Sequence, residues 1–494
     1  MRTRVKKWMM LSSVLGIILV VWFFSIAQAR GDLDVKEAIV KVYTVYNSPD
    51  YDNPWQMYGS NSCTGSGSII DGKQILTSAH VVADQTFIQV KRAGQASKYT
   101  AVVKIVAHEC DLAILEVRDD SFFLDVEPLE VGELPRLRDN IVVYGFPEGG
   151  DELCITEGVV SRVEHQFYAH SQEYLLTAQI DAAINPGSSG GPVIKDDKIV
   201  GVAFQAREGE NISYMVPAPL INYFLKDVED GKYDGIPCIG ISWQELENPD
   251  ARQRYKMTEE QTGVLVNKIY PGPSAKGLLK SEDIILSIDG KNIENDGTIE
   301  FRRGERTSFG HLVQNKFVND IVELQILRDG LLKNVEIKLT KTLGDFHLVP
   351  NEQYDTSPVY YILGGLLFQP LTLNVLKTWG TNWYDNAPRN LVNYYYRGEP
   401  TEDQKEVILL VRVLADEVNV GYHDREYEVI SEVNGKKIKD MNDMINAFES
   451  NKDKYHIIIN EGGSKIILDR AKAEESTQRI LDKYKIGSQK FLRE

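Results

Sequence analysis

The sequence predicts a mainly β-stranded protein built from several domains. The chain has 494 residues, which is enough for roughly three domains of ordinary size. Residues 38–216 consist of short β-rich runs between glycine, proline and acidic turns, with no long helical pattern among them. Two later stretches, each of roughly 110 residues, share one order of strand, strand–turn, helix and hairpin, which indicates a duplicated α+β domain.

The composition indicates a globular protein and argues against one that binds nucleic acid. Hydrophobic residues make up 43% of the chain and charged residues 26%, which is typical of a globular protein with a substantial core. The net charge of −17 argues against a protein that binds nucleic acid by neutralising its phosphates.

The N-terminus has the pattern of an export signal. A basic start, "MRTRVKK", precedes an apolar run without charges, and Ala27 and Ala29 suit a signal peptidase. The apolar run is also close to the roughly 20 residues that span a bilayer. We therefore expect residues 1–29 to be a cleaved signal peptide, with an uncleaved membrane anchor as the alternative. The rest of the chain is exported in both cases.

The cysteines leave two alternatives open. An oxidising compartment permits disulfides, but four cysteines in a chain of this length do not form a disulfide scaffold. Buried thiols are the other alternative. The sequence contains no CxxC motif and no cluster of histidine and cysteine, so we predict neither a metal site nor a cofactor. The four positions are Cys63, Cys110, Cys154 and Cys238.

The first region reads as an antiparallel barrel or sandwich, because many short strands follow one another without long helices. A helix is expected over 217–230, where a proline begins the pattern and a glycine follows it, and "DGKYDGIP" after it is a plausible linker. The expected strands are 38–46, 66–71, 86–92, 99–108, 111–117, 140–146, 154–163, 174–180 and 197–205.

The two repeated units are recognised by matching turns. "IILSIDGKNI" in the first and "EVISEVNGKKI" in the second each place a turn dipeptide between a strand and a lysine. The first unit also contains a hairpin signal at Asp329-Gly330. After about residue 473 the chain becomes charged, and we expect a surface helix there.

One stretch, rich in glycine and serine, has two structural interpretations. "NPGSSGGP" (185–192) is either a flexible linker or a turn that presents a serine nucleophile. A serine hydroxyl needs an adjacent base. His80 in "ILTSAHVV" follows an apolar strand, where a base can project into a cleft, although a lone histidine is often a structural residue. Asp111 in "AHECDLAILEV" is the candidate that orients the imidazole, ahead of its neighbours His108 and Glu109.

The order histidine, aspartate, serine is that of trypsin-like enzymes. "TSAHVV", "CDLAILEV", "VVYGFPEGGDELCITEGVVSRV" and "QIDAAINPGSSGGPVI" resemble the HtrA/Deg family of trypsin-like serine proteases. The later segments resemble the plant Deg-type branch with divergent PDZ domains. The resemblance implies a chymotrypsin-like double β-barrel followed by two PDZ-like α+β domains. The implied division is 1–29 signal, 30–231 protease, 236–343 first PDZ, 350–472 second PDZ and 473–494 charged tail.

The resemblance also assigns site residues. The family's nucleophile directly precedes "GGP", which selects Ser189 over Ser188, and His80 and Asp111 complete the triad. The backbone N–H groups of Gly187 and Ser189 are expected to form the oxyanion hole. Ser188 stands where the family usually has asparagine.

Substrate preference follows from the same comparison. The primary pocket is implied to include Ala183 and Ala203, from the segments 181–185 and 201–205. Because Ala183 occupies the position of the aspartate in trypsin-type enzymes, we predict cleavage after small apolar residues. Ordinary core packing is the other explanation for these small residues.

The remaining expectations concern partners. Ile239, Gly240 and Ile241 resemble the loop with which a PDZ domain holds a peptide carboxylate, and 363–368 ("LGGLLF") is a weaker counterpart. The family implies substrates that are unfolded proteins or peptides, and a homotrimer or a multiple of trimers. Tyr43, Tyr46, Tyr51, Trp55 and Tyr58 are candidates for the trimer contact, or are ordinary core residues.

The function expected is periplasmic degradation of unfolded or damaged proteins by an exported endopeptidase. The alternatives are a regulated signalling protease with one specific partner, a chaperone with minor proteolysis, and an enzyme tethered to the inner membrane.

Overall fold

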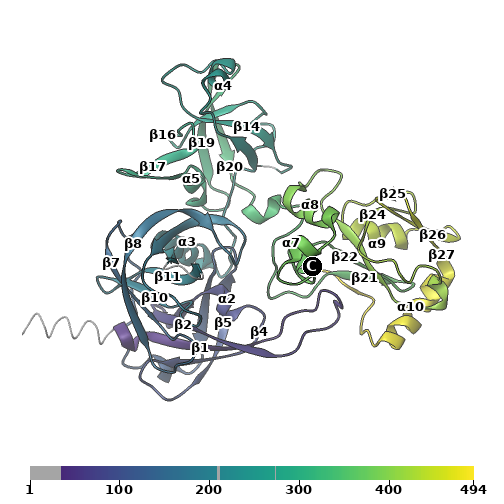
Figure 1. Cartoon of the computed structure of the whole chain (residues 1–494), viewed down its shortest axis with the longest axis horizontal. Helices are drawn as coiled ribbons and strands as arrows, with labels where there is room; N and C mark the ends of the chain where they lie inside the picture. Colours follow the sequence, from purple (N-terminus) through teal and green to yellow (C-terminus); the bar gives the residue numbers. More distant parts are fainter. Residues whose placement is uncertain (1–34, 208–211, 273, 494) are drawn as a thin grey trace, which may run out of the picture. The chain divides into compact units, whose positions relative to one another are not determined.

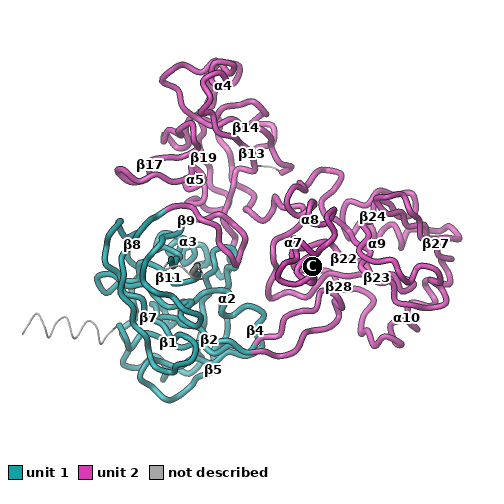
Figure 2. The backbone as a smooth tube through the Cα atoms, viewed as in Figure 1, with its two compact units in different colours: residues 1–45, 62–163, 176–233 teal, residues 46–61, 164–175, 234–494 magenta. Residues whose placement is uncertain are grey.

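The computed structural model describes residues 35–207, 212–272 and 274–493. It divides into two compact units (Figure 2), and each is described by itself. Unit 1 comprises the chain up to residue 45 together with 62–163 and 176–233; unit 2 comprises 46–61, 164–175 and 234–494. The expected export signal, 1–29, lies outside the described residues. Among the residues that are described, no helix is both long and apolar enough to cross a membrane.

Unit 1 contains two closed six-stranded barrels (Figure 1). The first has the strand order β1-β2-β3-β6-β5-β4 and the second β10-β11-β12-β9-β8-β7. The first barrel consists of β1 Ile39–Tyr46, β2 Asn61–Ile70, β3 Gln74–Thr77, β4 Gln85–Arg92, β5 Tyr99–Ala107 and β6 Leu112–Val117. The second consists of β7 Asn140–Gly145, β8 Cys154–Phe167, β9 Tyr174–Ile180, β10 Pro192–Lys195, β11 Lys198–Arg207 and β12 Ile212–Pro217.

The barrels confirm the predicted fold class. Three strands are absent from the expected ranges. The sequence indicated β3 only as the apolar run before His80, β10 has only four residues, and β12 ends in a proline. The helix expected over 217–230 forms as α3 Ala218–Asp227, followed by one 3₁₀ turn, η2 Val228–Asp230. Gly231, with φ +91°, ends it as a left-handed cap.

The first of the two expected PDZ-like domains lies in unit 2 and contains a sheet in the order β13-β14-β15-β19-β20, with β13 at the edge. The predicted hairpin at Asp329-Gly330 is confirmed, since both residues have positive φ, as a type I′ turn requires. The elements are β13 Ile241–Gln244, α4 Pro249–Arg254, β14 Val264–Ile269, β15 Ile284–Ile288, β16 Lys291–Asn292, β17 Thr298–Arg302, β18 Glu305–Ser308, α5 Gly310–Gln314, β19 Ile321–Arg328, β20 Leu331–Lys338 and η3 Leu343–Phe346.

The second PDZ domain repeats this plan with additions. Asn434-Gly435 turns the chain between β24 and β25 as Asp289-Gly290 does between β15 and β16, and all four residues have positive φ. Its sheet has the order β27-β26-β24-β23-β22-β21-β28. The elements are β21 Tyr360–Leu363, β22 Leu366–Pro370, α6 Leu373–Lys377, α7 Trp383–Asn386, α8 Arg389–Arg397, β23 Ile408–Val413, η4 Glu417–Asn419, β24 Glu428–Val433, β25 Lys436–Lys437, α9 Met441–Glu449, β26 Tyr455–Asn460, β27 Lys465–Asp469, α10 Arg470–Tyr484 and β28 Lys490–Phe491.

The weaker counterpart of the carboxylate loop, 363–368, lies at a strand edge that the chain itself occupies. Gly364 and Gly365 form the two-residue turn of the β21–β22 hairpin, and the Gly364 N–H donates to the Thr477 hydroxyl at 3.0 Å. Strand β21 therefore occupies the edge of β22, and Tyr361 on it stacks with Phe448 of α9 at 5.8 Å between ring centroids. A peptide could not add at this edge, because the chain's own strand already fills it.

The helix expected in the charged tail, 473–494, is present, but its inner face is buried. Helix α10 begins at Arg470, before the expected boundary, and it buries Ala473, Ile480 and Leu481 against the second PDZ domain. These residues recur at helical spacing within an otherwise charged sequence, so the charges cover only the outer face of the helix.

The 46–61 hairpin leaves the first barrel after β1 and belongs to unit 2. Its tip is closed by an Asp50 N–H to Gln56 carbonyl bond of 3.0 Å. Tyr51, only 6% exposed, enters the core of the second PDZ domain, and Gln369 donates to its carbonyl at 2.9 Å. Arg412 forms an ion pair with Asp52 at 3.2 Å. Tyr51 and Trp55, which the sequence offered as trimer contacts, are thus packed within the chain.

Replacing the buried ring tests this docking. Tyr51→Ala is expected to destabilise unit 2 by about 3 kcal/mol, because truncating a large buried side chain leaves a cavity. Met57→Ala, on the same hairpin but 48% exposed, should change stability by less than about 0.5 kcal/mol. Urea unfolding followed by tryptophan fluorescence reports on unit 2, since every tryptophan among the described residues lies there. Equal effects of the two variants would contradict the docking.

Candidate active site

His80 is held by a buried carboxylate. It lies in the short helix α2 Ala79–Val82, directly after β3. Its Nδ1 is 2.8 Å from Oδ2 of Asp111, and its main-chain N–H donates to Oδ1 of the same carboxylate at 2.9 Å. Asp111 is fully buried and has φ +56°, a left-handed conformation that aspartate tolerates better than most residues. Both carboxylate oxygens therefore fix the orientation of His80.

This contact sets the charge state of the imidazole. Burial alone lowers the pKa of His80, but the negative charge of Asp111 and the hydrogen bond to it raise the pKa, and the net pKa lies above its ordinary value. Since Nδ1 faces Asp111, the neutral ring carries its proton there. Nε2 is then the basic nitrogen.

Ser189 lies in a tight turn between β9 and β10. The Ser188 N–H donates to the Asn185 carbonyl at 2.9 Å, and the Gly191 N–H donates to the Ser188 carbonyl at 3.0 Å. The Gly190 N–H donates to the carbonyl of Ala203 on β11 at 2.8 Å. The stretch "NPGSSGGP" is thus an ordered turn fastened to the second barrel. The Ser189 hydroxyl is partly exposed and lies 3.5 Å from the Phe204 carbonyl.

Two glycines of the turn are required by space and by backbone conformation. Gly187 has φ +91°, and a Cβ there would lie 2.5 Å from the Phe146 carbonyl oxygen. Gly190 has φ +83°, and a Cβ there would lie 2.2 Å from the Ser66 carbonyl oxygen. No other residue fits either position without moving backbone atoms.

The hydrogen-bonded carbonyls of the turn determine where two of its N–H groups point. The Pro186 carbonyl accepts from Glu148 N–H at 2.7 Å, and the Ser188 carbonyl accepts from Gly191. In a trans peptide the N–H points opposite to the carbonyl, so the N–H groups of Gly187 and Ser189 point away from these partners. Within the described part of the chain, neither N–H donates to a protein acceptor. This arrangement is suited to binding an anionic oxygen.

The two residues expected in the primary pocket lie on either side of the turn. Ala203 is fully buried, and its carbonyl receives the Gly190 N–H. Ala183 is exposed, and its carbonyl accepts from the Thr156 hydroxyl at 3.1 Å. Ala203 is thus bonded directly to the turn that carries Ser189. Neither alanine has a charged side chain.

Sequence reasoning missed Ser66. This residue of β2 is fully buried, and its main-chain N–H donates to the Ser189 carbonyl at 2.8 Å. The glycines on both sides of it, in "GSGSII", indicate a close backbone approach, which was the available signal.

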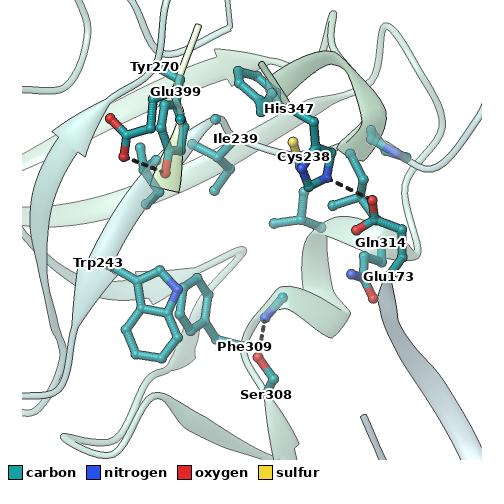
Figure 3. Close-up of a pocket in the computed structure, with 18 of the residues that line it drawn as sticks. Glu173, Cys238, Ile239, Trp243, Tyr270, Ser308, Phe309, Gln314, His347 and Glu399 are labelled. Atoms are coloured by element: carbon teal, nitrogen blue, oxygen red, sulfur yellow. Dashed lines mark hydrogen bonds and ion pairs between the residues drawn. The ribbon is translucent and has the colours of Figure 1, made fainter. Parts of the chain in front are cut away.

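Unit 2 contains a pocket of about 430 Å³ beside the first PDZ domain (Figure 3). It opens along the free edge of β13, and Ile239, Trp243 and Phe309 form its apolar wall. Gly240, with φ +78°, is covered by the ring of Phe346, which a Cβ would approach to 2.5 Å. Residues 395–399 line the opposite side, where Glu399 forms an ion pair with Lys268.

The cysteines and potential metal ligands lie as follows. Cys63, Cys110, Cys154 and Cys238 are present as thiols and not as disulfides. Burial raises the pKa of the Cys110 thiol well above its usual range. In the described ranges, no three His, Cys, Asp or Glu side chains are grouped as metal ligands would be.

Comparison with known proteins places the chain in a family. Residues 65–202 match the model of a trypsin-like peptidase domain, and 237–339 and 349–490 match models of PDZ domains. Protease Do-like 4, mitochondrial, from Arabidopsis thaliana is 40% identical over 91% of this chain and 84% of its own length. The chain belongs to the Do-like, or HtrA/Deg, family of serine proteases. It is therefore a serine endopeptidase.

Two further comparisons agree. Protease Do-like 2, chloroplastic, from the same plant is 38% identical over 93% of this chain and 75% of its own length. Among solved structures, HtrA-type protease AlgW with tripeptide aligns with a TM-score of 0.50 at 24% identity, covering 63% of this chain and 96% of that one. At 24% identity this likeness shows the fold alone.

The His80–Asp111 contact predicts a titration. The His80 imidazole should titrate above about 6.5, the ordinary histidine value, because the carboxylate stabilises imidazolium. Asp111→Asn removes that charge and leaves the burial, so the pKa should fall below the wild-type value. NMR of the full chain carrying ¹⁵N-labelled histidine measures both, with the His80 signal assigned by His80→Gln. An unchanged pKa in Asp111→Asn would contradict the electrostatic account.

Proposed function

We propose that this family member cleaves peptide bonds with His80, Asp111 and Ser189 as its catalytic triad. The observation that carries the proposal is the combination of a buried Asp111 bonded twice to His80 with an ordered turn around Ser189. The N–H groups of Gly187 and Ser189 are the proposed oxyanion hole.

The mechanism follows from these positions. Ser189 Oγ attacks the scissile carbonyl while His80 Nε2 accepts the hydroxyl proton. The carbonyl oxygen becomes negative and is stabilised by the two N–H groups of the turn. His80 then protonates the leaving amine, and an acyl-enzyme remains on Ser189. Water, deprotonated by His80, releases the acyl group. Asp111 remains ionised and stabilises the imidazolium that forms twice in each cycle.

The substrates proposed are unfolded or damaged proteins, cut after small apolar residues. Ala183 and Ala203 bring neither charge nor bulk to the site beside the Ser189 turn. Valine, isoleucine and alanine are usually buried in folded proteins, so such bonds become accessible mainly after unfolding. This preference suits quality control.

The first PDZ domain is proposed to bind peptide C-termini. Strand β13 lies at a sheet edge, and Ile239, Gly240 and Ile241 line the apolar pocket, where the Phe346 ring packs over Gly240. An added strand and a carboxylate held by backbone N–H groups would use both features. The relative solved with a tripeptide is itself an HtrA-type protease, which supports the proposal. In the second domain β21 fills the corresponding edge.

We propose that the chain is exported to the periplasm, because its N-terminus is basic and then apolar. The names of two plant relatives instead include the words mitochondrial and chloroplastic. N-terminal sequencing of the mature protein distinguishes a cleaved signal, with a start at Arg30, from an uncleaved anchor. A homotrimer is proposed from the family alone.

The proteolysis test uses unfolded casein. The wild-type chain is expected to produce fragments that end mainly in small aliphatic residues, and Ser189→Ala should reduce the rate by at least about 1000-fold. Ser188→Ala, the adjacent serine, is the matched control and should retain activity within roughly tenfold. Gel electrophoresis and mass spectrometry of the fragments provide the readout.

Each other outcome has a distinct meaning. Equal cleavage by the wild type and Ser189→Ala would exclude Ser189 as the nucleophile, and fragments ending in lysine or arginine would overturn the pocket assignment. Cleavage only after a defined peptide is added would favour a regulated signalling protease. Suppression of casein aggregation by Ser189→Ala would favour a chaperone.

Peptide binding is tested on the full chain carrying Ser189→Ala. A fluorescent decapeptide ending in valine should bind, and its amidated form should bind at least about tenfold more weakly, because the carboxylate is lost. Ile241→Asp should weaken binding similarly, whereas Ile321→Asp, an exposed position of the same domain outside the pocket, should not. Equal binding of the acid and the amide would contradict the assignment.

A further inference from the structure

Ser66 joins the two barrels of unit 1 at the nucleophile turn. It belongs to β2 of the first barrel, and its hydroxyl oxygen lies 2.8 Å from the Gly187 carbonyl oxygen and 2.8 Å from the Phe146 nitrogen. Both partners belong to the second barrel. All of these atoms are buried, so no solvent competes for the contacts.

The proton positions at this hydroxyl are determined by its partners. The Phe146 N–H can only donate, so the Ser66 oxygen accepts from it. The Gly187 carbonyl can only accept, so the Ser66 hydroxyl proton points to Gly187. The hydroxyl thus accepts one hydrogen bond from Phe146 and donates another to the Gly187 carbonyl of the turn. The Ser66 main chain adds a third bond, from its N–H to the Ser189 carbonyl at 2.8 Å.

The carbonyl bonded to Ser66 belongs to the peptide that lies between the two donor peptides of the proposed oxyanion hole. The Pro186–Gly187 peptide carries one donor N–H, and the Ser188–Ser189 peptide carries the other. The Gly187–Ser188 peptide connects these two planes. Because its carbonyl is bonded to Ser66, the rotation of this middle plane is limited, and so is the angle between the two donors. Gly187 has no side chain, so the plane is held by this bond at its carbonyl and by the 2.9 Å bond from the Ser188 N–H to the Asn185 carbonyl.

We propose that Ser66 is a positioning residue of the oxyanion hole. Its hydroxyl keeps the Gly187–Ser188 peptide in the rotation that aims the N–H groups of Gly187 and Ser189 at one point. The Ser66 hydroxyl and N–H bond to main-chain atoms of Gly187, Phe146 and Ser189, so Ser66 acts through the turn. The inference rests on the proposed triad and oxyanion hole.

The same strand provides a matched control. Ser68 follows two residues later on β2 and is equally buried. Among the described residues its hydroxyl has no hydrogen-bond partner. Ser68→Ala and Ser66→Ala therefore remove the same atom from the same strand, but only Ser66→Ala removes a bond to the turn.

The experiment compares kcat, KM and inhibition by a transition-state mimic. The substrate is the casein-derived peptide that the wild type cleaves best, and the mimic is a peptide aldehyde of the same sequence, whose adduct with the serine presents a tetrahedral oxygen to the hole. Ser66→Ala is expected to lower kcat by about 10- to 100-fold, less than the 100- to 1000-fold typical of losing a donor outright. KM should change by less than about threefold, since ground-state binding is not involved.

The aldehyde separates positioning from general damage. In Ser66→Ala its affinity should fall by about the same factor as kcat/KM, because both depend on the aim of the two N–H groups. Ser68→Ala should remain within about twofold of the wild type in every measurement. Equal effects of the two variants, a change confined to KM, or an unchanged aldehyde affinity would each overturn the inference.

A second variant is measured if Ser66→Ala does not fold. If near-ultraviolet circular dichroism shows that Ser66→Ala is unfolded, Ser66→Cys is measured instead, because a thiol fills the space but donates weakly. Its kcat should fall by roughly tenfold, within the range set for a misaimed donor; a wild-type kcat would overturn the inference. Ser189→Ala is assayed in parallel: if it cleaves as the wild type does, the proposed function fails and this inference fails with it.

Discussion

The burial of Asp111 is the constraint on which the rest of the site depends. A fully buried carboxylate is costly unless hydrogen bonds replace its water, and the main-chain and ring nitrogens of His80 supply two of these bonds. The short helix after β3 and the left-handed backbone of Asp111 place the two side chains in this geometry. The imidazole is thereby oriented, and Nε2 is left as its basic nitrogen.

The sequence predicted the fold class and the residues of local motifs, because the chemistry there is encoded in adjacent positions. The glycines at 187 and 190 and the position of Ser189 follow from one short stretch. Ser66 and Gly187 are 121 positions apart, and Tyr51 meets a glutamine 318 positions later. No local pattern carries such pairings. The burial of α10 was missed for another reason: three apolar residues were outnumbered by the charges of its outer face.

The second PDZ domain shows one fold used in two ways. In the first domain the edge of β13 is open to a pocket, whereas in the second β21 and then β28 extend the sheet. The second sheet is buried on both faces, by α9 on one and by α10 and Tyr51 on the other. One face of this sheet therefore packs against Tyr51 of the 46–61 hairpin. The edge of β22, which corresponds to the edge of β13, is paired with the chain's own strand β21.

Chemical labelling tests the central claim most directly. A fluorophosphonate reacts only with a serine that is activated by a base and faces an oxyanion hole. After the full chain is treated, peptide mass spectrometry should find one adduct, on Ser189, and none in protein carrying His80→Ala. An adduct on Ser188 or elsewhere, or labelling that persists without His80, would contradict the account.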